Sequence, residues 1–198
     1  MTLRAIAFDA YGTLFDVYSV GALAEQRFPG KGAELAAQWR DTQIAYTRIR
    51  TLSDRYVPFW QVTEEALAFS ARKLGLDLTD EDLGALKELK KLGLPLAILS
   101  NGTPEMLDIA VKSAGMNGLF DHLLSVEAVK KYKTTPEAYR LGPDAFKLPA
   151  REILFVSSNC WDAIGATWFG YTTFWINRSG QPLEELGAQP AIQGRLLT

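Results

Sequence analysis

The chain has 198 residues, enough for one sizeable hydrophobic core and a small accessory domain. Its apolar content of 47% and charged content of 22% are those of an ordinary globular protein, and a formal net charge of −2 gives no electrostatic case for binding nucleic acid. A single cysteine, Cys160, excludes an intramolecular disulfide, and the N-terminal apolar run is too short for a signal peptide or a membrane span. We therefore expect a cytoplasmic protein whose partners are neither nucleic acid nor membrane.

The first expected element is a buried strand near the N-terminus. Residues 4–9, Arg-Ala-Ile-Ala-Phe-Asp, form a short apolar run, and the turn signal Tyr11-Gly12-Thr13 comes soon after it. We therefore expect the strand to end at Asp9.

Helical patterns follow one another from Val17 to about Leu92. We expect helices around residues 20–26 and over residues 33–52, 63–74 and 80–91. Most of this stretch is interpreted as a helical cap inserted after the first strand, while the last helix belongs to the core. The predicted organisation is a core of residues 1–16 and 80–198 with a cap of residues 17–79.

The remainder of the chain alternates between strands and helices. Apolar runs at residues 96–99, 123–126, 153–156 and 172–176 predict strands, and their continuous apolar character is typical of a parallel sheet covered on both faces. Thr103-Pro104 and Thr135-Pro136 each place a capping residue and a helix-starting proline before a helical pattern. The alternation predicts a doubly wound, Rossmann-like α/β fold.

Polar residues follow four of the expected strands, where ligands bind in parallel α/β sheets. These groups are Asp9, Ser100-Asn101, the segment 130–133 and the segment 157–162. A carboxylate such as Asp9 can act as a covalent nucleophile, and a nearby cation such as Lys133 keeps it ionised. A second carboxylate, Asp162, is placed to orient or deprotonate a water. Further groups could hold oxygen atoms in place: Ser100, Ser157, Asn159 and backbone amides at helix starts.

These motifs resemble those of the haloacid dehalogenase superfamily. Residues 8–16, Phe-Asp-Ala-Tyr-Gly-Thr-Leu-Phe-Asp, are similar to its first motif, in which Asp is followed by x-x-Gly-Thr. Residues 99–102, 132–133 and 155–162 match the later motifs in order, and residues 39–52 look like the cap of the (S)-2-haloacid dehalogenases. The resemblance covers nearly the whole chain.

One position distinguishes the branches of this superfamily. Its phosphatases carry a second Asp two residues after the nucleophile, which protonates the leaving group, and an acidic pair in the last motif that holds Mg²⁺. Here Tyr11 occupies the first of these positions, and the last motif has the single carboxylate of Asp162. A halide leaves without a proton, whereas phosphoryl transfer needs its charge neutralised. The sequence therefore favours a dehalogenase; the alternatives are a Mg²⁺-dependent phosphatase and a catalytically impaired relative.

The resemblance implies a two-step reaction without cofactor or metal. Asp9 attacks the α-carbon of a short (S)-2-haloalkanoate and forms an ester with inversion, and water then hydrolyses the ester to the (R)-2-hydroxyalkanoate. The resemblance implies that the catalytic residues are Asp9, Thr13 and Lys133, and that Tyr139 supports Lys133. Arg40 is implied to reach from the cap towards the halide or the carboxylate. The residues implied to lie near the water are Ser157, Asn159 and Asp162. The implied substrate-binding residues are Ser100, Asn101 and the amides of Ala10 and Tyr11, with apolar walls from Tyr11, Phe59 and Trp161. Homodimerisation through the cap helices is implied as well.

The chain departs from the family pattern in two places. Residues 79–85 bridge cap and core where relatives carry a further helix, and a final strand and helix are not expected after Gly187. Either the chain is a shortened form of the family pattern, or the molecule has residues that this sequence lacks. A smaller departure is Lys133-Thr134-Thr135-Pro136, since relatives place proline directly after the lysine.

Overall fold

The computed structural model describes residues 3–10, 13, 24–76, 98–113, 120–178 and 180–195. Its larger sheet has four parallel strands in the order β1 (Ala5–Phe8), β4 (Ile153–Ser157), β5 (Thr172–Ile176) and β6 (Ile192–Gly194). A second parallel pair joins β2 (Leu99–Ser100) and β3 (Leu124–Ser125). The predicted parallel α/β architecture is confirmed, with the described strands divided between two sheets.

Strand β6 corrects the expectation that no strand follows Gly187. Its three residues pair with Phe174, Trp175 and Ile176 of β5, and the Asn177 amide donates to the Gly194 carbonyl. The sequence signal was weak because β6 is short and partly exposed at the edge of the sheet.

Three helices of the core connect the strands: α5 (Pro104–Ser113), α6 (Pro136–Phe146) and α7 (Cys160–Phe169). Short 3₁₀ turns lie at Val126–Ala128 and Ala150–Glu152. The Thr103 hydroxyl accepts a hydrogen bond from the Met106 amide, as its capping role predicts. Thr135 occupies the predicted N-cap position of α6, but its hydroxyl donates to the Tyr132 carbonyl and makes no capping hydrogen bond.

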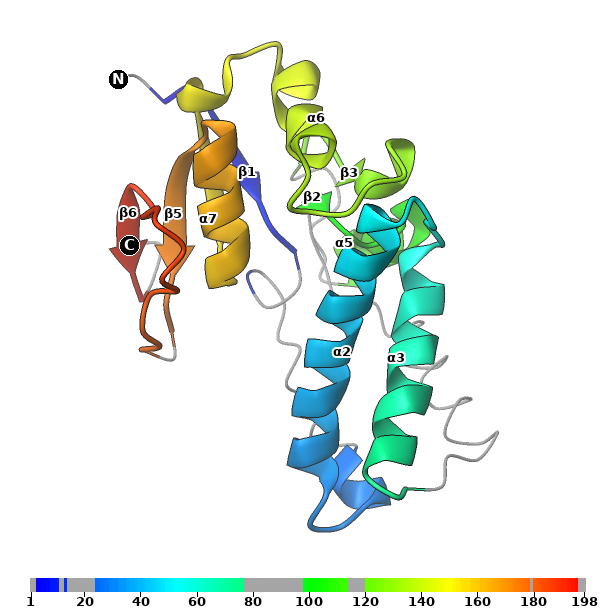
Figure 1. The fold of residues 1–198 in the computed structure, drawn as a ribbon. Helices are drawn as coiled ribbons and strands as arrows, with labels where there is room; N and C mark the ends of the chain where they lie inside the picture. The colour runs from blue at the N-terminus through cyan, green and yellow to red at the C-terminus, as the bar shows by residue number, and fades with distance from the viewer. Residues whose placement is uncertain are drawn as a thin grey trace.

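The long helices α2 (Gly32–Leu52) and α3 (Phe59–Lys73) lie side by side and extend away from the strands (Figure 1). Helix α3 begins four residues before the predicted start at Thr63, because the Pro58 carbonyl already accepts from the Gln61 and Val62 amides. Residues 24–27 are helical, as expected for the first cap helix, and the helix predicted over residues 80–91 lies outside the described residues.

Two apolar clusters hold these layers together. The core cluster lies between the strands and helices α6 and α7, and its buried members are Ala7, Leu99, Tyr139, Ile153, Phe155, Ala166 and Tyr171. The second cluster joins α3 to the core, and its buried members are Phe59, Val62, Val126, Tyr132 and Ala138. The helix pair is therefore packed directly against the segment that precedes Lys133.

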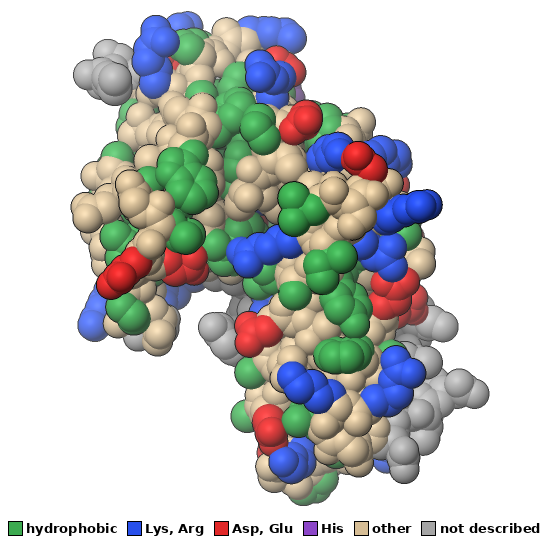
Figure 2. All heavy atoms as spheres, in the orientation of Figure 1, with side chains coloured by type: hydrophobic (Ala, Val, Ile, Leu, Met, Phe, Trp, Pro, Cys, Tyr) green, Lys and Arg blue, Asp and Glu red, His purple; other side chains and the backbone are tan. Residues whose placement is uncertain are grey.

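The visible surface carries acidic and basic side chains scattered among apolar and uncharged ones (Figure 2). Among the described helices, none combines the length and the apolar character needed to cross a membrane.

Candidate active site

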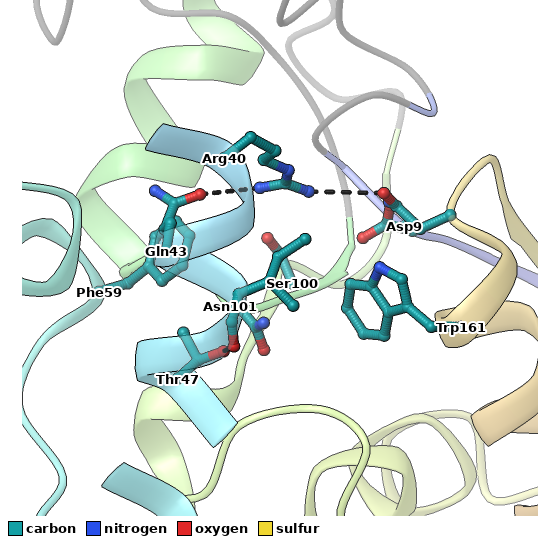
Figure 3. A pocket seen from close by; sticks show the side chains of 10 residues that line it. Asp9, Arg40, Gln43, Thr47, Phe59, Ser100, Asn101 and Trp161 are labelled. Atoms are coloured by element: carbon teal, nitrogen blue, oxygen red, sulfur yellow. Dashed lines mark hydrogen bonds between the residues drawn. The ribbon is translucent and has the colours of Figure 1, made fainter. Parts of the chain in front are cut away.

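A pocket lies where helices α2 and α3 face the carboxyl ends of β1 and β2 (Figure 3). It encloses about 340 Å³, including its open mouth. Its walls are formed by Asp9, Arg40, Gln43, Ile44, Thr47, Phe59, Ser100, Asn101, Asn159 and Trp161. The structure therefore brings together, in one pocket, residues from both the predicted core and the predicted cap.

Asp9 is the best-anchored group on the pocket wall. Its Oδ1 accepts from Lys133 Nζ at 3.0 Å, and its Oδ2 accepts from Thr13 Oγ1 and Asn159 Nδ2, both at 2.9 Å. Ser157 Oγ lies 3.4 Å from the same Oδ2. Because the side chain is nearly buried and donors hold both oxygens, the carboxylate has a fixed direction towards the pocket.

Lys133 lies in the interior with an acidic partner on either side. Its Nζ is 3.0 Å from Asp9 Oδ1 and 2.9 Å from Asp162 Oδ2, and its backbone amide donates to Asn101 Oδ1 at 3.0 Å. Burial is the strongest single influence on the pKa of Lys133 and lowers it, but the charges of Asp162 and Asp9 together raise the pKa above its ordinary value. Lys133 is therefore a permanent cation next to Asp9.

Asp162 is fully buried behind Lys133 and is not among the described residues that line the pocket. Its Oδ1 accepts from the Tyr139 hydroxyl at 2.7 Å, and its Oδ2 from Lys133. Burial and the charge of Asp9 raise the pKa of Asp162 above the ordinary aspartate value, although Lys133 acts in the opposite direction. The predicted contact between Asp162 and a pocket water therefore requires a rearrangement that this structure does not show.

Tyr139 supports Lys133 through Asp162 and not by direct contact. The Tyr139 carbonyl accepts from the Tyr171 hydroxyl at 2.6 Å, and both rings belong to the core cluster. Helix α7 passes so close that a Cβ at Gly165 would lie 2.7 Å from Tyr139 Oη and 2.8 Å from Thr134 Cγ2. Gly165 therefore leaves the space in which the Tyr139 hydroxyl reaches Asp162.

Thr13 is held from two directions. Its Oγ1 accepts from the Ser158 amide at 2.7 Å, and its carbonyl accepts from the Arg178 guanidinium at 2.6 Å. The Ser158 carbonyl in turn accepts from Trp175 Nε1 at 3.1 Å. The sequence assigned no role to Ser158, although it lies within the last motif, or to Arg178, which lies outside the motifs.

Helix α2 presents one face to the pocket. Arg40 donates to Gln43 Oε1 at 2.8 Å (Figure 3) and lies 3.5 Å from Asn159 Oδ1, and Gln43 donates to Thr63 Oγ1 at 2.7 Å. Gln43, Ile44 and Thr47 were not predicted, although their spacing from Arg40 places all four on one face of a helix.

The remaining predicted residues have mixed outcomes. Ser100 and Asn101 line the pocket, and Ser100 Oγ accepts from the Gly102 amide at 3.0 Å. Phe59 and Trp161 form walls, as expected, and the Arg48 guanidinium lies 5.5 Å from the Trp161 ring centre. Ala10 is buried and is not among the described lining residues, and Tyr11 lies outside the described residues.

Within the described ranges, no three His, Cys, Asp or Glu side chains are grouped as metal ligands.

Comparison with known proteins places this geometry in a family. The family model of the haloacid dehalogenase-like hydrolases matches residues 3–170. The (S)-2-haloacid dehalogenase of Pseudomonas sp. (strain YL) is 48% identical, over 95% of this chain and 88% of that protein. Haloacetate dehalogenase H-2 of Moraxella sp. (strain B) is 43% identical, over 95% of this chain and 92% of that protein.

Solved structures show the same relationship. The L-2-haloacid dehalogenase RSc1362 is 56% identical with a TM-score of 0.89, covering 98% of this chain and 95% of that chain. The L-2-haloacid dehalogenase from Xanthobacter autotrophicus, with chloropropionic acid covalently bound, is 32% identical with a TM-score of 0.86 and the same coverage. The chain therefore belongs to the haloacid dehalogenase-like hydrolases, and within that family to the (S)-2-haloacid dehalogenases.

Proposed function

We propose that this protein hydrolyses short (S)-2-haloalkanoates to (R)-2-hydroxyalkanoates through an ester formed on Asp9. The observation that carries the proposal is the Asp9 carboxylate, which opens onto the pocket while Lys133, Thr13 and Asn159 donate hydrogen bonds to it. The relative from Xanthobacter autotrophicus, which has chloropropionic acid covalently bound, supports the same chemistry here.

In the first step a carboxylate oxygen of Asp9 forms a bond to C2 of the substrate. The carbon–halogen bond breaks on the opposite side, the halide leaves with the bonding electron pair, and C2 inverts. Lys133 forms an ion pair with the Asp9 carboxylate and fixes its direction, which supplies the alignment that an in-line displacement needs. No proton is transferred in this step, in keeping with Tyr11 at the position where the phosphatases carry the acid that protonates the leaving group.

We assign the departing halide to Arg40. Arg40 enters the pocket from α2, across from Asp9 at the end of β1, while Ser100 and Asn101 lie on β2 and directly after it (Figure 3). The leaving group must depart on the side opposite the nucleophile, which is the side of the cap. Ser100, Asn101 and the amides of Ala10 and Tyr11 are then the proposed partners of the substrate carboxylate, with Phe59 and Trp161 beside its alkyl part.

In the second step water attacks the carbonyl carbon of the Asp9 ester. Ester formation removes the negative charge of Asp9, so Lys133 keeps Asp162 as its charged partner among the described residues. We place the attacking water between the ester and Asp162, where it takes the place of the contact between Asp9 and Lys133. Ser157 and Asn159 lie next to the carbonyl of the Asp9 ester. Burial raises the pKa of Asp162, which makes it a stronger base than an exposed aspartate, and we assign one proton of the water to it. The bond between the carbonyl carbon and the oxygen on C2 then breaks, and that oxygen takes up this proton to become the hydroxyl of the product. The second proton of the water is lost to solvent as the Asp9 carboxylate reforms.

We also propose the domain division and the assembly that the sequence indicates. Residues 17–79 act as a cap over a core of residues 1–16 and 80–198, supported by the pairing of α2 with α3 above the pocket. A homodimer through the cap is supported by the exposed apolar side chains of Ile49, Leu52 and Phe69 on these helices. The single cysteine supports a cytoplasmic location.

Enantiopure substrate tests the proposed activity. The protein should release chloride from (S)-2-chloropropionate but not from the R enantiomer, without added metal, and yield (R)-lactate. Replacing Asp9→Asn removes the nucleophile and should abolish release, by a factor on the order of 10³ or more, as for other covalent nucleophiles. A protein that released no halide but hydrolysed p-nitrophenyl phosphate with Mg²⁺ would instead be a phosphatase.

The choice of halogen tests the role of Arg40. Arg40→Lys loses the planar guanidinium and should lower kcat for 2-chloropropionate by about 10²-fold, the usual cost of one lost donor to a developing anion. The loss should be smaller for 2-iodopropionate, because iodide disperses its charge and depends less on a donor. Arg72→Lys on α3 is the matched control, since Arg72 is exposed and donates a hydrogen bond to the Ala68 carbonyl of its own helix. Equal losses of kcat for both substrates would indicate that Arg40 binds the substrate carboxylate and not the departing halide.

Gly165→Ala tests the support of Lys133. The new Cβ displaces the Tyr139 hydroxyl from Asp162, so kcat should fall about tenfold, as expected for one lost hydrogen bond to a charged group. Tyr139→Phe removes the same hydroxyl, and the double variant should be scarcely slower than either single variant. Losses that multiply in the double variant would show that Gly165 and Tyr139 act independently.

A further inference from the structure

The residue directly before Lys133 is held by the cap. Tyr132 is fully buried, and its ring lies between two cap aromatics, with ring centres 5.2 Å from Tyr56 and 6.0 Å from Phe59. Phe59 also lines the pocket. Tyr132 thus connects Tyr56 and the pocket-lining Phe59 to the backbone of Lys133.

Two hydrogen bonds join Tyr132 to the cap. Its backbone amide donates to Thr51 Oγ1 at 3.1 Å, and its hydroxyl donates to the Val57 carbonyl at 2.7 Å. Both acceptors lie in residues 51–57, at the end of α2 and in the turn that leads to α3. The next amide in the chain, that of Lys133, donates to Asn101 of the core. Consecutive amides are therefore fixed by the cap and by the core, respectively.

Two further contacts join the lysine segment to the turn between α2 and α3, but they contribute less to holding the two together. Lys131 forms an ion pair with Asp54, and the Lys130 ammonium lies 5.1 Å from the Tyr56 ring centre. Asp54 and Lys130 are exposed, and exposed ion pairs contribute little. The buried bonds of Tyr132 are therefore the main link between this turn and the lysine segment.

We propose that Thr51 and Tyr132 form a cap-to-core clasp that positions the Lys133 ammonium against Asp9. The inference rests on the proposed function and extends it: the turn between α2 and α3 becomes part of the apparatus that aligns the nucleophile. Neither residue touches the pocket space, so both are positioning residues. An error on the order of 1 Å in such an alignment can cost about 10²-fold in rate, so a small shift of the segment is sufficient to be measured.

The chain offers a close set of variants. Thr51→Val keeps the shape but removes the oxygen that accepts from the Tyr132 amide, whereas Thr51→Ser keeps that oxygen. Tyr132→Phe removes the hydroxyl that donates to Val57. Tyr56→Phe is the matched control, because the buried Tyr56 hydroxyl has no hydrogen-bond partner within the described structure.

Kinetics on (S)-2-chloropropionate provide the first readout. Thr51→Val and Tyr132→Phe should each lower kcat about tenfold, the effect of one misplaced hydrogen bond, with KM changed less than about twofold. Thr51→Ser and Tyr56→Phe should keep the kcat of the parent protein. A loss confined to KM, or an equal loss in Tyr56→Phe, would overturn the clasp as a positioning device.

Hydrogen exchange provides a second readout that does not depend on turnover. The amides of Tyr132 and Lys133 should exchange faster in Thr51→Val than in Thr51→Ser, while the strand amides of β4 keep the parent rates. If the parent protein releases no halide, the proposed function fails and exchange alone decides whether the clasp exists. Unchanged exchange at both amides, or faster exchange with unchanged kcat, would contradict the proposal.

Discussion

The structure of the site depends on one buried ammonium that two carboxylates share. A single charge in the interior is costly, and an ion pair is retained there only when further hydrogen bonds satisfy its members. Lys133 lies between Asp9 and Asp162, and two anions against one cation leave an excess of negative charge. The other hydrogen-bond donors stabilise this excess negative charge: Thr13 and Asn159 donate to Asp9, while Tyr139 donates to Asp162.

The sheet supplies the geometry for this arrangement. Strands β1 and β4 are parallel with Phe8 opposite Val156, so Asp9 and Ser157 leave the sheet side by side. Helix α7 begins directly after Asn159, which places Asp162 in its first turn behind the strand ends. Short motifs far apart in the sequence therefore meet because parallel strands end at the same edge.

This edge was the most predictable part of the molecule. The positions of Asp9, Ser100, Lys133 and Ser157 could be inferred from apolar runs followed by polar residues, since burial of parallel strands leaves a clear pattern. The indirect support by Tyr139 could not, because a tyrosine six residues after a lysine reaches either the lysine or its partner. The same holds for residues of α2 beyond Arg40: helical spacing gives their common face, but not which face meets the pocket.

The parts that the sequence did not predict depend on contacts between distant segments. The bond between Thr51 and Tyr132 joins residues 81 positions apart, and neither local pattern shows that the two residues meet. Strand β6 is stabilised by its pairing with β5, not by an apolar run of its own. In both cases tertiary packing decides what local preference leaves open.

The cap therefore has two connections to the chemistry. Through Arg40 it brings a cation to the pocket, and through residues 51–57 it contacts the segment that carries Lys133. In the proposed mechanism these two connections would couple substrate enclosure to alignment of Asp9, because the helix pair that lines the pocket also contacts the lysine segment.

The central claim is that Asp9, held by Lys133, carries the covalent intermediate, and oxygen labelling in one turnover tests it most directly. Excess enzyme is mixed with (S)-2-chloropropionate in water enriched in heavy oxygen, and both the product and the peptide containing Asp9 are weighed by mass spectrometry. The ester route places one heavy oxygen in the Asp9 carboxylate and leaves the hydroxyl of the first product molecule unlabelled. Heavy oxygen in that hydroxyl, with Asp9 unlabelled, would show that water attacks the substrate directly and would contradict the account.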